Sequence, residues 1–327
     1  MRNYSAVQAH SRKNCITSSF QRSPTVSLVI VMCSKRKRAP ADPTLSARDL
    51  EDGSAQQVAK TWGERLQQAA PTTKAGHLYA GRGFLEARRA AAHLDARLAI
   101  VSAGFGLIDA TTVVPSYSLT TSVQDPDNVL RKTGGLSADW WNAVQAVTPY
   151  ASKAATEETG LILAALSSGY LAMVADEWSQ WPTERLDRLR LFTKERPSGS
   201  AAALLTAWMP YDDRLNAVGV GFAGTQGDFA QRALRHFATS FGGSPSTTAD
   251  AALVRLALNG LAAPMRPKRP RLADDAIIAL IRENWDVVGG RSGAMLTHLR
   301  RTVGFGCEQD RFKTLFHAAA QRRSKAA

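Results

Sequence analysis

The hydrophobic pattern of residues 26–32 is apolar at nearly every position and rich in β-branched side chains. Such a run is typical of a strand that is buried on both faces of a sheet. Residues 98–102 show the same pattern, and residues 161–166 show it with alanines that also allow a helix. Residues 188–193 and 203–208 predict two further short strands.

Helical periodicity lies between these runs. Residues 56–70 and 78–94 predict amphipathic helices, and residues 226–241 predict a third with its aromatic side chains on one face. Strands that alternate with helices in this way predict an α/β fold with a mainly parallel sheet and helices on both faces. We place this α/β domain at residues 25–263, after a basic and polar arm at residues 1–24 that we expect to be disordered.

A domain boundary follows at residues 264–271, where three prolines and four basic residues predict a linker. Beyond it, residues 272–327 contain three helical stretches that are separated by glycine turns. Short helices joined by such turns predict a small all-α domain similar to a helix-turn-helix. The three expected helices span residues 274–285, 292–303 and 308–322.

The net charge of +13 is concentrated at the two ends of the chain. Residues 1–40 hold eight basic and no acidic residues, residues 264–327 hold thirteen basic and six acidic ones, and the region between them carries −2. Clustered Lys and Arg side chains are typical of proteins that bind a phosphate backbone, because each contact releases counterions. A solvated basic surface is the alternative, and we favour nucleic acid.

The three cysteines are far apart and odd in number, which excludes a disulfide framework and a CxxC metal knuckle. They favour a reducing compartment, so we expect a cytoplasmic protein, and no apolar run is long enough to span a membrane. No P-loop, HExxH, GxSxG or zinc-deaminase motif occurs. The GxGxxG at residues 219–224 follows a poor strand pattern. We therefore expect neither a metal nor a nucleotide cofactor.

Small residues follow three of the predicted strands, at residues 33–35, 102–106 and 167–170. Ligands of open α/β sheets bind beyond the carboxyl ends of the strands, where such residues expose backbone N–H groups. Ordinary turns between strands and helices also use Gly and Ser. The threefold recurrence, with Lys35 and two aromatic residues beside it, favours a site.

Acidic residues for catalysis are less well marked. Asp125, Asp127 and Asp139 precede Trp140, and a carboxylate there could activate water, although solvated loop acids are the default interpretation.

In the C-terminal domain, basic residues cluster on or beside the second and third helices and suit a helix that enters a DNA groove. A helical lid on the first domain is the alternative. The basic residues are Arg291, Arg300, Arg301, Arg311 and Lys313.

Four short segments carry a resemblance to known proteins: residues 29–35, 78–84, 100–107 and 114–117. Together they resemble bacterial proteins that are distantly similar to the base-modifying domain of archaeosine synthase. More remotely, they resemble the peroxide-stress DNA-binding family and folds like uracil-DNA glycosylase. The same segments also resemble antiviral DNA glycosylases that excise glucosylated hydroxymethylcytosine. The resemblance covers roughly residues 26–240 and is strongest over 28–120.

The resemblance implies a pocket for a nucleobase that is flipped out of double-stranded DNA and stacked on an aromatic ring. It departs from uracil-DNA glycosylase at the first strand, where Cys33-Ser34-Lys35 replaces an Asp-containing loop and Asp42 is the nearest acid. We take Lys35, Asp42 and Asp127 as catalytic candidates. The expected substrate-binding residues are Cys33, Ser34, Ser102, Gly104, Phe105, Tyr117, Ser168 and Tyr170.

These observations favour a DNA glycosylase for a modified base, with a role in phage defence. A DNA-binding protein that senses a small ligand is the second hypothesis, and a nuclease is the third. The sequence leaves three points open: which base is recognised, whether the substrate is DNA or RNA, and the oligomeric state.

Overall fold

The computed structural model describes residues 25–122, 125–263 and 269–324. They cluster into two compact units that divide between residues 264 and 265, at the predicted linker. The predicted arm and most of the linker lie outside the described residues. In the described part of the chain, no helix combines the length and the apolar character that crossing a bilayer requires.

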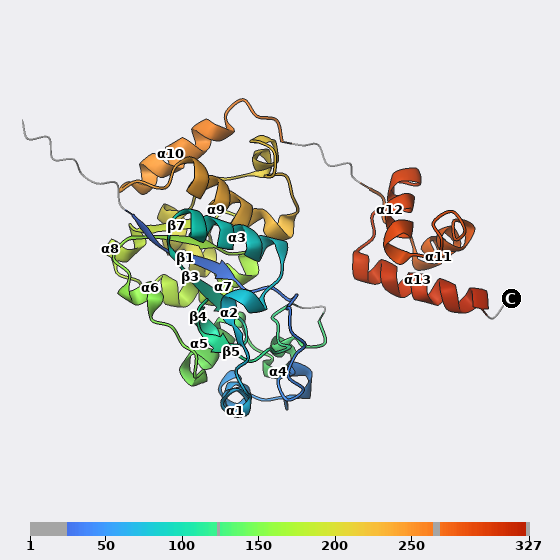
Figure 1. Ribbon diagram of the computed structural model, residues 1–327, viewed down its shortest axis with the longest axis horizontal. Coiled ribbons are helices and arrows are strands. Elements are labelled where there is room, and N and C mark those ends of the chain that lie inside the picture. Colours follow the sequence, from blue (N-terminus) through green and yellow to red (C-terminus); the bar gives the residue numbers. More distant parts are fainter. Residues whose placement is uncertain (1–24, 123–124, 264–268, 325–327) are drawn as a thin grey trace, which may run out of the picture. The chain divides into compact units, whose positions relative to one another are not determined.

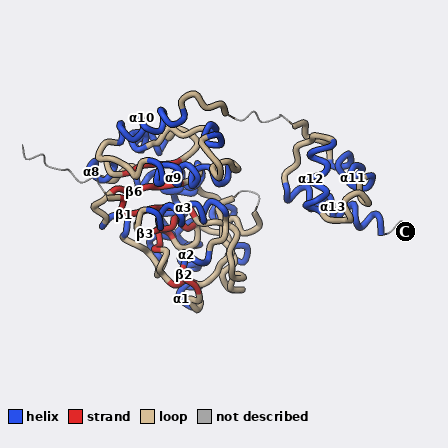
Figure 2. The backbone as a smooth tube through the Cα atoms, turned by 45° about the horizontal axis from the view of Figure 1, so that its top comes forward, coloured by secondary structure: helices blue, strands red, loops and turns tan. Residues whose placement is uncertain are grey.

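A five-stranded sheet forms the centre of the N-terminal unit, with helices around it (Figures 1 and 2). β1 (Val26–Met32) pairs in parallel with β3 (Arg97–Ser102) on one side and with β6 (Leu161–Ala165) on the other. β7 (Leu189–Phe192) continues the sheet in parallel beyond β6. β4 (Gly106–Asp109) lies antiparallel at the edge beside β3. The predicted α/β class with a mainly parallel sheet is confirmed.

Both faces of β1 are covered, which explains why its sequence does not alternate. Val29 and Val31 pack into one core with the helices α3 and α9, and Leu28 and Ile30 pack into a second core with α7. The helices of this unit are α1 (Ala55–Gln68), α2 (Ala75–Leu78), α3 (Arg82–His93), α4 (Val129–Thr133), α5 (Ser137–Val147), α6 (Ala154–Glu157), α7 (Ser168–Trp178), α8 (Thr183–Leu186), α9 (Phe229–Ser240) and α10 (Thr247–Leu258).

One predicted strand is wrong. Residues 203–208 belong to the end of a 3-10 helix, η2 (Gly199–Ala207), and only Trp208 forms an isolated bridge to β7. Ala201, Leu204 and Ala207 are buried at a spacing of three residues, which matches the three residues per turn of this helix. The shorter elements are η1 (Ala47–Asp49), η3 (Asp213–Ala217), η4 (Gln226–Asp228), β2 (Thr73–Lys74) and β5 (Val113–Val114).

The C-terminal unit has its own hydrophobic core, to which Ile277, Leu299 and Phe312 contribute from three different helices. The three predicted helices are confirmed to within a few residues. They are α11 (Asp274–Glu283), α12 (Ser292–Thr302) and α13 (Gln309–Ser324). Gly289 and Gly290 have positive φ angles in the turn before α12, a conformation that favours glycine.

Candidate functional site

The order of the strands reverses beside β1, because the chain builds β3 and β4 on one side and β6 and β7 on the other. In open α/β sheets this reversal opens a crevice at the carboxyl ends of the strands. A pocket of about 560 Å³ lies there. Cys33, Ser34 and Lys35 after β1 line it together with Ser167 and Tyr170 after β6. The structure thus brings two of the three predicted strand ends into one site.

The opposite wall of this pocket comes from the beginning of α3 and from η4 and α9. Phe84 adds an aromatic ring there, and Gln231 adds a buried amide. Within the described part of the chain, Oε1 of Gln231 has no hydrogen-bond partner. Asp228 accepts a hydrogen bond from Nε of Arg232 at 2.7 Å and lies 3.4 Å from Nε of Arg82. This wall combines aromatic, amide and charged groups.

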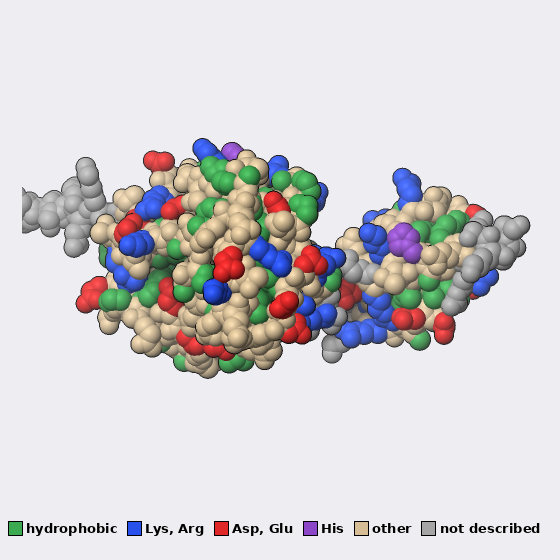
Figure 3. All heavy atoms as spheres, turned by 90° about the horizontal axis from the view of Figure 1, so that it is seen from below, with side chains coloured by type: hydrophobic (Ala, Val, Ile, Leu, Met, Phe, Trp, Pro, Cys, Tyr) green, Lys and Arg blue, Asp and Glu red, His purple; other side chains and the backbone are tan. Residues whose placement is uncertain are grey.

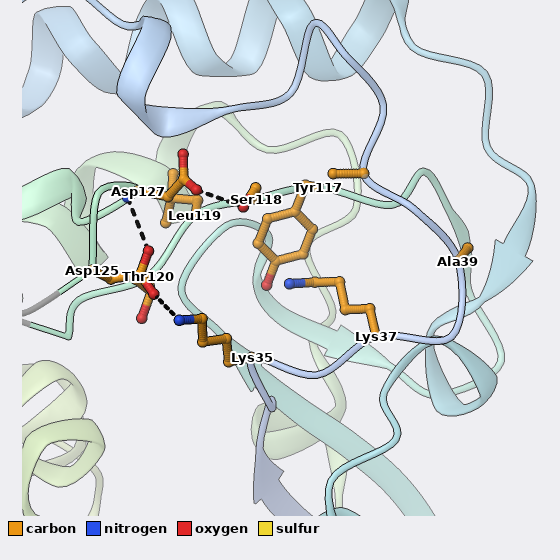
Figure 4. Close-up of a pocket in the computed structure, with 10 residues that line it drawn as sticks. Lys35, Lys37, Ala39, Tyr117, Ser118, Leu119, Thr120, Asp125 and Asp127 are labelled. Atoms are coloured by element: carbon orange, nitrogen blue, oxygen red, sulfur yellow. Dashed lines mark hydrogen bonds and ion pairs between the residues drawn. The ribbon is translucent and has the colours of Figure 1, made fainter. Parts of the chain in front are cut away.

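A smaller recess of about 190 Å³ adjoins the pocket, and Lys35 lines both (Figure 4). Lys37, Tyr117, Asp125 and Asp127 also line the recess. Figure 4 shows the Lys37 side chain beside the Tyr117 ring and Lys35 directed toward Asp125. Two lysines and two carboxylates therefore line the recess that adjoins the larger pocket.

Asp125 is the carboxylate that faces this junction. Its side chain is 6% exposed, and its Oδ2 forms an ion pair with the ammonium of Lys35, which is 74% exposed. Its Oδ1 accepts a hydrogen bond from the backbone N–H of Asp127 at 3.0 Å. The interpretation of Asp125 and Asp127 as solvated loop acids is therefore wrong, because the loop folds inward and both become buried. Asp139 is exposed in the first turn of α5.

Asp127 also lines the recess, but hydrogen bonds from the surrounding loops occupy its carboxylate. Arg48 donates to Oδ1 from Nε at 3.0 Å and to Oδ2 from Nη2 at 2.6 Å. The hydroxyls of Ser46 and Ser118 each donate at 2.8 Å. The hydrogen bonds from Arg48, followed by those of the two serines, hold the pKa of Asp127 well below its usual range in spite of its burial. A carboxylate with this many donors fixes the backbone beside Asp125.

We expect Asp127→Asn to lower the melting temperature at pH 7 by several degrees. The folded-state pKa of Asp127 is depressed, so the stability that its charge contributes is present above the unfolded pKa of about 3.9 and is lost as the pH falls below it. The difference between wild type and variant should therefore shrink below about pH 4. Thermal unfolding between pH 2.5 and 8 measures it, and a difference that is constant over this range would contradict the assignment.

The floor beneath the recess is a buried hydroxyl and thiol network. Oγ of Ser102 lies 2.8 Å from Oη of Tyr117 and accepts a hydrogen bond from Oη of Tyr79 at 3.2 Å. The Cys33 thiol lies 3.0 Å from Oη of Tyr170. Burial raises the pKa of Tyr117 and Tyr170 well above the usual value. Both phenols therefore stay neutral and able to donate hydrogen bonds at physiological pH.

Two buried indole groups hold the loop that follows β3 through hydrogen bonds to its backbone. Nε1 of Trp62 donates to the carbonyl of Gly104 at 2.6 Å, and Nε1 of Trp140 donates to that of Ala103 at 2.7 Å. Phe105 is fully buried, with its ring centroid 4.6 Å from that of Tyr117 in an edge contact. The rings of Phe105 and Tyr117 are thus packed in the core, and Tyr170 is the predicted stacking residue that lines the larger pocket.

Gly104 is needed because a Cβ built on it would lie 2.6 Å from the ring of Tyr117. We expect Gly104→Ala to destabilise the protein by about 1–3 kcal/mol through overpacking. Gly169→Ala is the matched control, since its Cβ has no atom within 4 Å and lies in helix α7. Thermal unfolding of the two variants compares them, and equal melting temperatures would contradict a packing role for Gly104.

Five predicted site residues line neither cavity. Ser102, Gly104 and Phe105 are buried at the end of β3 and in the loop after it, and the other two are Asp42 and Ser168. Asp42 is half-buried and accepts hydrogen bonds from the backbone N–H and the hydroxyl of Thr44, which lower its pKa. It does not line the pocket or the recess. Ser168 is exposed in the first turn of α7, and the neighbouring Ser167 lines the pocket in its place.

Several residues that line the site were not among the predicted catalytic or substrate-binding residues, and three of them carry polar groups that the proposed chemistry uses. Lys37 belongs to a basic run that predicted only charge, yet it lies two residues after Lys35, and alternate residues of an extended segment share a side. Asp125 likewise lies two residues from a predicted site residue, Asp127. Gln231 lies 50 residues or more from every other predicted segment of the pocket, and no sequence pattern distinguishes it.

The basic residues of the C-terminal unit divide into two groups. Nη2 of Arg300 donates to the carbonyl of Cys307 at 2.7 Å, and Arg311 binds Asp274 and the carbonyl of Leu272. These two arginines hold the helices together. Figure 3 shows Lys and Arg side chains at several places on the visible face of this unit. Of the predicted set, Arg291, Arg301 and Lys313 are exposed.

Comparison of the chain with protein-family models, with curated proteins and with solved structures finds no match. The resemblance to DNA glycosylases therefore stays a prediction. Among the described residues, no group of three or more His, Cys, Asp or Glu side chains is arranged to hold a metal ion. The geometry at the ends of β1 and β6 is what supports a function.

Proposed function

We propose that the N-terminal unit is a DNA glycosylase that hydrolyses the N-glycosidic bond of a modified base. The observation that carries this proposal is the junction of the two cavities, where Lys35 lines both and pairs with the buried carboxylate of Asp125. A base in the larger pocket would place its glycosidic bond toward this junction. A negative and a positive side chain would then flank the bond that breaks.

The chemistry needs both charges. Breaking the bond builds positive charge on the sugar and negative charge on the departing base. Asp125 stabilises the sugar cation or accepts a proton from the attacking water, in the way that carboxylates act in glycoside hydrolysis. Lys35 stabilises the negative charge on the base. The water oxygen bonds to C1′ of the sugar as the C1′–N bond breaks, Asp125 accepts the proton that the water loses, and the departing base takes up a proton from solvent on its ring nitrogen.

The larger pocket has the features of a base-binding site. Its volume of about 560 Å³ lies within the range of about 300–1,000 Å³ that is usual for small-ligand pockets. Tyr170 and Phe84 offer rings for stacking, and Oε1 of Gln231, which has no hydrogen-bond partner among the described residues, offers an acceptor for the edge of the base. The space suits a base with a substituent, and we propose modified bases, such as those of phage DNA, as substrates.

Double-stranded DNA is the partner that we propose for the C-terminal unit. Arg291, Arg301 and Lys313 are exposed and carry the charge that phosphate contacts require. Cys33 and Cys307 are buried free thiols, which supports a reducing compartment such as the cytoplasm.

The proposal is tested with end-labelled duplexes that carry one modified cytosine, beside an unmodified duplex of the same sequence. After incubation and hot alkali, we expect breaks confined to the modified position, because alkali cleaves abasic sites. Breaks at many positions without alkali would identify a nuclease. Binding without any break would identify a protein that only senses DNA or a ligand.

A further inference from the structure

The glycosylase proposal leaves one charged residue of the recess without a role. Lys37 lies half-buried on the segment after β1, and its Nζ lies 4.0 Å from the centroid of the Tyr117 ring and 6.0 Å from that of Tyr79. A backbone bridge between Lys37 and Tyr79 fixes the segment, together with hydrogen bonds of its neighbours Arg38 and Arg36. The side chain is therefore held in the recess by both backbone and ring contacts.

Lys37 differs from Lys35 in its charge environment. Lys35 is exposed and forms an ion pair with Asp125, whereas no carboxylate among the described residues lies within ion-pair distance of the Lys37 ammonium. Burial lowers the pKa of Lys37, against the weaker raising effects of Cys33 and Asp125. A larger share of its amine is therefore unprotonated at neutral pH than for an ordinary lysine, and an unprotonated lysine is a nucleophile toward carbonyl carbons.

We propose that Lys37 is the nucleophile of a second activity, in which the enzyme cleaves the DNA strand at the abasic site. This inference rests on the proposed function, because the abasic sugar is the product of base release. The recess next to the base pocket is where that sugar would lie. Lys37 and Asp125 both line this recess, so an amine and a carboxylate face the same sugar.

The steps balance without a further reactant. The Nζ lone pair of Lys37 attacks C1′ of the open, aldehyde form of the abasic sugar, and loss of water gives a protonated imine. Asp125 removes a proton from C2′, the C2′–C3′ double bond forms, and the C3′–O bond breaks. The phosphate leaves as the 5′-phosphate end of the downstream strand. Water then hydrolyses the imine, which releases an unsaturated aldehyde at the 3′ end and restores the amine.

The test uses the full chain and a duplex with a preformed abasic site, so that base release is bypassed. Sodium borohydride reduces an imine to a stable amine, and we expect a covalent protein–DNA adduct with the wild type. Lys37→Arg keeps the positive charge but should lose the adduct at least 100-fold, since a guanidinium forms no imine. Lys60→Ala, at an exposed lysine of α1, is the matched control and should keep it.

The outcomes separate this inference from the proposed function. An adduct with preformed abasic DNA that depends on Lys37 supports the inference even if no base is released from modified DNA. Base release with breaks only after alkali and with no adduct would overturn the inference and leave the glycosylase intact. An adduct that survives Lys37→Arg but not Lys35→Ala would also overturn it. Melting temperatures of the variants exclude loss of folding as the cause.

Discussion

Asp125→Asn should lower the rate of base release about 100-fold or more, because removal of a positioned acid or base costs roughly 10²–10⁴ in rate. The amide can still accept the hydrogen bond from the backbone of Asp127, so the loop should keep its conformation. The substitution removes the charge that pairs with Lys35 and that faces the sugar. Single-turnover release of the base, with the melting temperature measured in parallel, checks this expectation.

Asp42→Asn is the control for Asp125→Asn. Asp42 is the acid closest in sequence to the first strand, but it is only half-buried and lines neither cavity. We expect base release within a factor of two or so of the wild type, since surface substitutions away from a site have small effects. A large loss for Asp42→Asn with normal activity for Asp125→Asn would contradict the assignment of the carboxylate.

The second large effect concerns DNA affinity. A chain that ends at residue 263 keeps the whole N-terminal unit and should fold, because the two units have separate cores. Its affinity for duplex DNA should fall at least 10-fold at low salt. The slope of log K against log salt should become shallower by about 0.9 for each phosphate that the shortened chain no longer neutralises. Titrations at several salt concentrations measure both quantities.

Substitution in the full chain separates charge from the mere presence of the unit. Replacing Arg291, Arg301 and Lys313 together with glutamine should reproduce much of the change in slope, because all three are exposed. The control replaces three exposed basic residues of the N-terminal unit that lie outside both cavities. These are Lys60, Lys74 and Arg255. Equal slopes for the two triple variants would contradict a DNA-binding role for the C-terminal unit.

The fold was predictable where burial leaves a pattern in the sequence. The uninterrupted apolar run of β1 identified a central strand, because helices cover both of its faces. The small residues after β1 and β6 identified the end of the sheet at which the pocket lies. The prediction of a strand at residues 203–208 was wrong because alanine and leucine pack equally well in a strand and in a 3-10 helix. Only tertiary contacts decide between the two.

The site was predictable only in part, for a related reason. Asp125 and Asp127 have the same residue type and lie two positions apart. Arg48, which is distant in sequence, donates hydrogen bonds to Asp127 and leaves Asp125 as the carboxylate that pairs with Lys35. Phe105 and Tyr117 looked like stacking residues, but Trp62 and Trp140 hold the loop beside them in the core. Such assignments depend on residues far away in the sequence.

The central claim is tested most directly by mass spectrometry of the small molecules that the enzyme releases from modified duplex DNA. We expect the free modified base, in an amount equal to the sum of the abasic sites and the strand breaks formed at the modified position, and its loss with Asp125→Asn. A modified nucleotide in place of the free base would mean that phosphodiester bonds are cut. That result, or a base that is released equally by Asp125→Asn, would contradict a glycosylase site at the end of β1.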